Sequence, residues 1–205
     1  MKESIKIDIL CLEVHAGSLI ESLANIVQEN EEYKLQKRRN DITGTPRLLF
    51  SRDGFNIEFR SPRSGESTGR FRVQAGRINE KTDLTDIPNL REMINAFVDL
   101  YTAIDGSPVM GFGIAPSQPV AVPLPEGDYP SSPRRFINWL DLYPPEEVER
   151  IGRQTLLSTP APEVEELDDG SILVVSKHPF SDDPIEDIAN HIGIHFWGQD
   201  PGLVR

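Results

Sequence analysis

Two histidines four residues apart form the first pattern in the chain that resembles chemistry. His191 and His195 lie in the stretch NHIGIHFW, and this spacing places two imidazoles on one face of a helix. A zinc site needs three or four ligands, and the metalloprotease pattern has a glutamate after the first histidine, which HIGIH lacks. Gly193 also weakens any helix that carries both histidines. We therefore expect no metal here and interpret the segment as a helix end packed through Phe196 and Trp197.

Patterns for nucleophilic catalysis and phosphate binding are missing from the sequence. No serine lies in a G-x-S-x-G nucleophile elbow, and Cys11 lies in an apolar strand pattern, where an inert buried thiol is expected. The glycines of GFG at 111–113 lack the third glycine and the following helix of a phosphate-binding loop. We expect no enzymatic activity and no cofactor. The alternatives are a small metal-dependent enzyme built on His191 and His195 and an accessory protein of uncharacterised type.

Carboxylates form the densest chemical pattern in the second half of the chain. General acid–base catalysis needs two of them in one pocket with separated pKa values. The alternation in EVEELDD instead predicts that Glu163 and Glu165 lie on the solvent face of a hairpin. We interpret these residues as a surface that docks a cationic protein, with Trp139, Tyr143 and Trp197 as possible anchors whose favoured role is core packing. The candidate partner-binding residues are Glu146, Glu147, Glu149, Glu163, Glu165, Glu166, Asp168, Asp169, Trp139 and Tyr143.

The negative charge of the chain is concentrated in its second half. Residues 1–104 contain 16 acidic and 15 basic residues, a net charge of −1, whereas residues 105–205 contain 17 and 6, a net charge of −11. This asymmetry favours a basic partner and disfavours nucleic acid or an anionic membrane, with solubility alone as the alternative reading. The cations Lys34, Lys37, Arg38 and Arg39 are not interleaved with aromatic residues, so they predict a solvated sheet face and loop.

Other bulk features predict a cytoplasmic protein. The single cysteine, Cys11, excludes an internal disulfide and a multi-thiolate metal site. No apolar run approaches the roughly 20 residues that cross a bilayer. The N-terminal sequence MKESIKIDIL has no secretory-signal pattern.

Hydrophobic periodicity predicts an α+β fold with a mostly antiparallel sheet. The first half has the order β-α-β-β-β-α-β, which is ferredoxin-like with an extra strand and has two helices on one face of the sheet. The residues KLQKRRND fall in a loop. The expected elements are strands over 4–14, 70–78 and 107–116, a hairpin over 47–61 and helices over 18–30 and 86–105, the last with an apolar stripe of Leu90, Met93, Ile94, Phe97, Val98 and Tyr101.

The second half adds a C-terminal extension in the order α-α-β-β-α. Prolines at 116, 119, 123, 125, 130 and 133 mark a connector. We therefore divide the chain into an α+β sheet domain at 1–116, a connector at 117–133 and an acidic extension at 134–205, packed on the first part as one globular unit. The expected elements are helices over 133–143, 144–152 and 182–197 and a hairpin over 162–178 that turns at Asp168–Asp169–Gly170.

Four motifs in the second half carry a family resemblance. They are Trp139–Leu140 before a short break, VERIGR at 148–153, LLSTPA at 156–161 and EELDDGSILVV at 165–175. Together they make residues 136–180 similar to immunity proteins that accompany bacterial polymorphic toxins and type VI secretion effectors. Upstream of them the likeness is one of architecture, and none of the motifs is catalytic. The resemblance implies a cytoplasmic inhibitor that binds one cognate toxin and blocks its active site.

Overall fold

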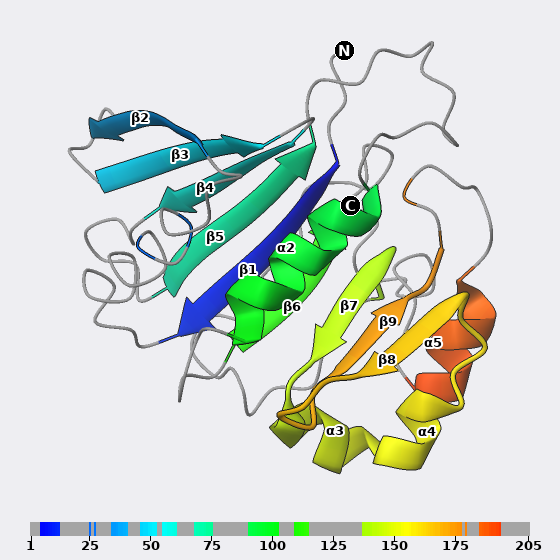
Figure 1. The fold of residues 1–205 in the computed structure, drawn as a ribbon. Coiled ribbons are helices and arrows are strands. Elements are labelled where there is room, and N and C mark those ends of the chain that lie inside the picture. The colour runs from blue at the N-terminus through cyan, green and yellow to red at the C-terminus, as the bar shows by residue number, and fades with distance from the viewer. Residues whose placement is uncertain are drawn as a thin grey trace, which may run out of the picture. The chain divides into compact units, whose positions relative to one another are not determined.

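The structure is a computed structural model of the chain, and Figure 1 shows its helices and strands. The described residues are 5–12, 25, 27, 34–40, 46–52, 55–60, 68–75, 90–102, 109–114, 137–177, 179 and 185–193. The chain divides into two compact units, Met1–Gly111 and Phe112–Arg205, and each is described by itself. The predicted connector at 117–133 and most of the predicted helix at 18–30 lie outside the described residues.

The first unit contains a sheet of antiparallel strands, as predicted. The strands are β1 (Lys6–Leu12), β2 (Lys34–Asn40), β3 (Pro46–Arg52), β4 (Phe55–Arg60) and β5 (Thr68–Ala75). Within this unit they follow the order β2-β3-β4-β5-β1, and each pair of neighbours is antiparallel. The predicted hairpin at 47–61 is confirmed as β3 and β4. The predicted α+β class is therefore correct.

Strand β2 corrects one prediction, because KLQKRRND was expected to be a loop. Its residues pair with β3, from Lys34 opposite Ser51 to Asn40 opposite Pro46, with an irregularity between Leu35 and Lys37. A strand at the end of the strand order tolerates charged residues, which also protect it from pairing with other chains. The pairing with β3 therefore outweighs the weak β propensity of the segment.

One face of this sheet is apolar and carries helix α2 (Leu90–Thr102). The isoleucines at positions 5, 7, 9 and 57 are all buried, and the register places Ile7, Val73 and Ile57 in one row across three strands. Helix α2 contacts β1 and β5. Its buried residues Met93, Ile94, Ala96, Phe97, Leu100 and Tyr101 include four of the six positions of the predicted stripe, which confirms its direction.

The second unit contains a small antiparallel sheet of three strands. These are β7 (Leu140–Tyr143), β8 (Glu163–Glu166) and β9 (Ile172–Val175), in the order β7-β9-β8. Strands β8 and β9 confirm the predicted hairpin at 162–178. A further strand, β6 (Val109–Ile114), crosses the division between the units and matches the strand predicted at 107–116.

Strand β7 corrects a second prediction, because residues 133–143 were expected to be helical. Every residue of β7 is buried, and every residue of its neighbour β9 is buried as well. A strand covered on both faces has a continuous apolar pattern instead of an alternating one, so its period does not distinguish it from a short buried helix. Pairing with β9 selects the extended form.

Three short helices cover the sheet of the second unit. Helix α3 (Pro145–Ile151) begins at Pro145 and has Gly152 as its C-cap, as predicted. Helix α4 (Arg153–Leu157) follows directly as a separate helix, which the sequence pattern does not distinguish from α3. Helix α5 (Glu186–Ile192) ends at Gly193, whose φ of +76° is left-handed. This C-cap ends α5 at Ile192, and residues 182–184 and 194–197 of the predicted helix lie outside the described residues.

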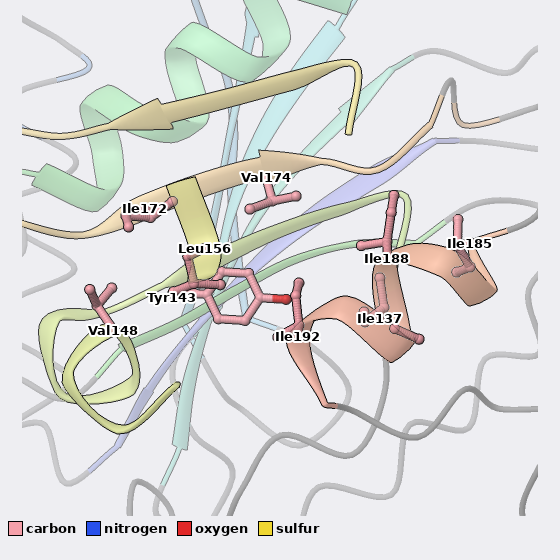
Figure 2. Packing of buried hydrophobic residues seen from close by; sticks show 10 residues of the cluster. Ile137, Tyr143, Val148, Leu156, Ile172, Val174, Ile185, Ile188 and Ile192 are labelled. Atoms are coloured by element: carbon pink, nitrogen blue, oxygen red, sulfur yellow. The ribbon is translucent and has the colours of Figure 1, made fainter. Parts of the chain in front are cut away.

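The core of the second unit lies between these helices and the sheet. Figure 2 shows Tyr143 of β7 with its ring close to Leu156 of α4 and Ile192 of α5. The predicted apolar side of α5 is confirmed, because Ile185, Ile188, Ala189 and Ile192 are all buried in this cluster. Burial of one large aliphatic side chain contributes about 1.5–3 kcal/mol, so this cluster is a major source of stability for the unit.

Candidate functional site

Six carboxylates of the second unit form what we call the acidic surface. Glu146, Glu149, Glu165, Asp168 and Asp169 are exposed, and Glu163 is half-buried. They lie on α3, on β8 and in the turn between β8 and β9. Of the eight predicted carboxylates, only Glu147 is buried; Glu166 is exposed as well, but it pairs with Arg153 and is therefore not counted in the acidic surface.

The strand register explains why several of these carboxylates lie at one end of the sheet. Tyr143, Ile172 and Glu166 are opposite one another across β7, β9 and β8. Helix α3 begins two residues after Tyr143, and the β8–β9 turn begins directly after Glu166. Glu146 and Asp168 therefore leave the sheet at the same end, although they are far apart in the sequence.

The β8–β9 turn holds its two aspartates in different ways. The backbone N–H of Leu167 donates to Ser171 O over 2.8 Å, and Gly170, with φ of +85°, donates to Leu167 O over 2.9 Å. Asp169 accepts hydrogen bonds from the N–H and the Oγ of Ser171, each at 2.9 Å. The side chain of Asp169 therefore stabilises the turn in the manner of an Asx motif. Both aspartates are exposed.

Strand β8 separates its side chains between two environments. Val164 packs against the hydrophobic core, so Glu163 and Glu165 belong to the opposite face, as predicted from the alternation. Glu166 accepts hydrogen bonds from Arg153 of α4, with 2.7 Å between Nε and Oε1 and 2.5 Å between Nη2 and Oε2. The hydrogen bonds from Arg153 lower the pKa of the Glu166 carboxyl. The Glu166 carboxylate is therefore already paired with Arg153 of the same chain.

Glu147 is buried, which corrects its assignment to the partner-binding surface. Its side chain is 0% exposed, and its Oε1 lies 3.0 Å from Nη2 of Arg150. In a short helix, one of two adjacent glutamates faces the sheet while the other faces water. Pairing with an arginine compensates part of the cost of burying the carboxylate.

Two of the three aromatic anchor candidates are core residues. Trp139 and Tyr143 are both fully buried, so neither is available as a surface anchor in this structure. Trp139 packs against β6 so closely that a Cβ placed on Gly113 would overlap the indole ring. The expectation that a glycine of β6 permits close approach is confirmed at this position. Trp197 lies outside the described residues.

The described residues of the second unit carry a strong excess of negative charge. Ranges 137–177 and 185–193 contain 11 acidic residues against Arg150, Arg153 and Lys177, a net charge of −8. Both arginines already pair with glutamates of their own chain. The exposed carboxylates within these ranges therefore contribute to a net negative field.

His191 contacts helix α4 and the residue that follows it. Its Nε2 lies 2.9 Å from the backbone oxygen of Thr155 and 3.2 Å from Ser158 Oγ. A carbonyl oxygen only accepts hydrogen bonds, so Nε2 donates to Thr155 and the lone pair of the neutral ring lies on Nδ1. Within the described ranges, no three His, Cys, Asp or Glu residues gather closely enough to hold a metal ion. His195, the other residue of the metal alternative, lies outside these ranges.

A buried carboxylate that the sequence does not reveal lies on β7. Asp141 is 0% exposed, and it accepts hydrogen bonds from Asn138, at 2.6 Å from the backbone N–H and 2.7 Å from the side-chain amide. These bonds fix the bend that leads into β7, and they offset the cost of desolvating the carboxylate. The spacing of Asn138 and Asp141 in INWLD is the local signal, since short polar side chains often bond to the backbone three residues away.

Comparison with known proteins adds no family to this description. None of the helices in the described part of the chain has both the length and the apolar character that crossing a bilayer requires. The description of the acidic surface on the three-stranded sheet and of its buried aromatic residues therefore rests on the structure of this chain alone. No protein-family model matches the chain, and no curated protein shows significant similarity to it.

Proposed function

We propose that this protein is a non-enzymatic, cytoplasmic inhibitor of the immunity type, which neutralises a cognate toxin through its acidic surface. The observation that carries the proposal is the excess of exposed carboxylates on α3, β8 and the β8–β9 turn. The resemblance of residues 136–180 to immunity proteins supports it independently of the charge. The partner is then a basic protein, and no cofactor is needed.

The physical role of such a surface is to guide association. A dense group of carboxylates attracts a basic protein over about one Debye length, roughly 8–10 Å at physiological salt. Complementary charge raises the association rate and fixes the relative orientation of two proteins more than it sets their affinity. A row of carboxylates also resembles a polyanion, so it can occupy a basic cleft in the toxin and exclude the anionic substrate.

Burial indicates which of the candidate residues are accessible to a partner. Glu146 and Asp168 are exposed and lie at the same end of the sheet. Glu147, Trp139 and Tyr143 are removed from the proposed interface because their side chains are in the core. Glu146 and Asp168 have the same charge and are both exposed, so replacing these two residues tests the interface more cleanly than replacing the whole acidic stretch.

The test measures association with the product of the gene immediately upstream. The variant Glu146→Lys/Asp168→Lys is compared with wild type by stopped-flow fluorescence at low ionic strength. We expect the association rate to fall on the order of tenfold, and the difference to shrink as salt is added. Co-expression with the upstream gene provides a second readout, because wild type is expected to restore growth.

The matched control changes the net charge equally at two acidic positions outside the acidic surface. Glu92→Lys/Asp187→Lys has this property, with Glu92 on α2 and Asp187 on α5. Thermal unfolding of each variant verifies that it is folded. Association of the Glu146→Lys/Asp168→Lys variant at the wild-type rate contradicts the proposed mechanism, and an equal loss in both variants attributes the effect to net charge alone.

A further inference from the structure

Four arginines occupy one row across the sheet of the first unit. In the strand register, Arg39 is opposite Arg47, Arg47 is opposite Arg60, and Arg60 is opposite Arg70. Residues directly opposite each other in antiparallel strands belong to the same face of a sheet. The row therefore crosses β2, β3, β4 and β5 on one face. With neighbouring strands about 4.8 Å apart, it extends over about 14 Å.

The face that holds this arginine row has more basic than acidic positions. Positions two residues apart along a strand share a face, so the register also assigns the flanking rows. The basic positions on this face are Lys6, Lys34, Lys37, Arg39, Arg47, Arg60, Arg70 and Arg72, and the acidic positions are Asp8 and Glu58. The opposite face is the apolar one that contacts α2. We call the first one the basic face.

The arginine row concentrates positive charge along one line of the sheet. Like charges directly opposite each other disfavour the pairing of two strands, and the row contains three such pairs in succession. An anionic ligand along the row would reduce this repulsion. Arginine is also the cation whose planar group binds phosphate and carboxylate oxygens in pairs.

We propose that the basic face binds duplex nucleic acid through the phosphate backbone, without reading the bases. The proposal goes beyond the inhibitor function and does not depend on it. Charge density favours this ligand. The row has one cation per about 4.8 Å, whereas an extended acidic peptide offers one carboxylate per about 6.8 Å on a given face. Each strand of a duplex carries one phosphate per about 3.4 Å of the helix axis, which is a higher charge density than that of the peptide.

A duplex is favoured over a single strand because the basic face lacks a stacking platform. Proteins that bind single strands combine cations with aromatic residues on which the bases stack. The aromatic positions of these strands, among them Phe50, Phe59 and Phe71, fall on the other face in the register. The net charge of −11 on residues 105–205 belongs to a different part of the chain. The composition does not show the arginine row, which becomes visible only in the strand register.

The test measures binding of the full-length protein to a short fluorescein-labelled DNA duplex by fluorescence anisotropy. Contacts with four phosphates predict that log K falls with log salt concentration with a slope of about −3.6. The variant Arg47→Gln/Arg60→Gln removes the centre of the row, and the slope is expected to become shallower by about 2. Arg39→Gln, on the edge strand β2, is expected to change it by about 1.

The matched control is Arg38→Gln/Arg52→Gln, which removes the same charge from the other face. Arg38 is opposite Leu48 and Arg52 is opposite Phe55, and neither belongs to the arginine row. Wild-type affinity of this control supports the proposal, and circular dichroism verifies the fold of each variant. No duplex binding at low salt, an equal loss in the control, tighter binding of the unpaired strand, or equal competition by polyglutamate would each overturn it.

Discussion

Replacing Gly113 by alanine tests how closely the indole of Trp139 packs against β6 in the core of the second unit. The added Cβ would overlap the indole ring of Trp139, which is 0% exposed. Overpacking a dense core by one methyl group costs about 1–3 kcal/mol. In a chain of this length, about 2 kcal/mol corresponds to a decrease of about 4–8 °C in the melting temperature. By contrast, a glycine-to-alanine substitution at an unstrained strand position with no such close neighbour is expected to be mildly stabilising.

A double-mutant cycle with Trp139→Leu makes this prediction specific. The smaller side chain leaves room for the alanine, so Gly113→Ala should cost clearly less in the Trp139→Leu background than in the wild type. The melting temperatures of the four proteins are measured by circular dichroism under identical conditions. Equal costs of Gly113→Ala in both backgrounds refute the reasoning, because the penalty then does not come from the indole.

Three further predictions follow from contacts of the second unit. Arg153→Gln should raise the pKa of the Glu166 carboxyl toward its ordinary value, measured by NMR titration. Because that pKa is lowered in the folded state, the pair stabilises the protein above the ordinary pKa of a glutamate, and this contribution is lost as the pH falls through the lowered value. Asp169→Ala should destabilise the protein by about 1 kcal/mol in urea denaturation, whereas Asp168→Ala should have almost no effect. Ile188→Ala should cost about 2–5 kcal/mol in the same assay, since its side chain is buried in the core.

Elements whose burial follows one clear period could be predicted from the sequence. The apolar side of α5 and most of the apolar stripe of α2 are examples, because a single row of large aliphatic residues has one way to be buried. The β8–β9 hairpin is another, since DDG between two apolar runs is a local turn signal. These signals are local and need no knowledge of the neighbouring strands.

Segments whose form depends on a distant partner could not be predicted. Residues 34–40 and 140–143 become strands only because β3 and β9 pair with them. The same limitation applies to the candidate sites. Exposure of Asp168 follows from turn chemistry, whereas burial of Glu147 depends on which side of a seven-residue helix meets the sheet. The arginine row depends on the register of four strands, which no local pattern encodes.

The sequence of β8 also affects how the protein behaves at high concentration. This strand stands last in the strand order, and an edge of this kind tends to recruit the same strand from another molecule. Three of its four residues are glutamates, so two copies approaching edge to edge repel each other at neutral pH. Replacing these glutamates by uncharged residues removes this protection, and the second unit is then expected to aggregate while its helices and core are still formed.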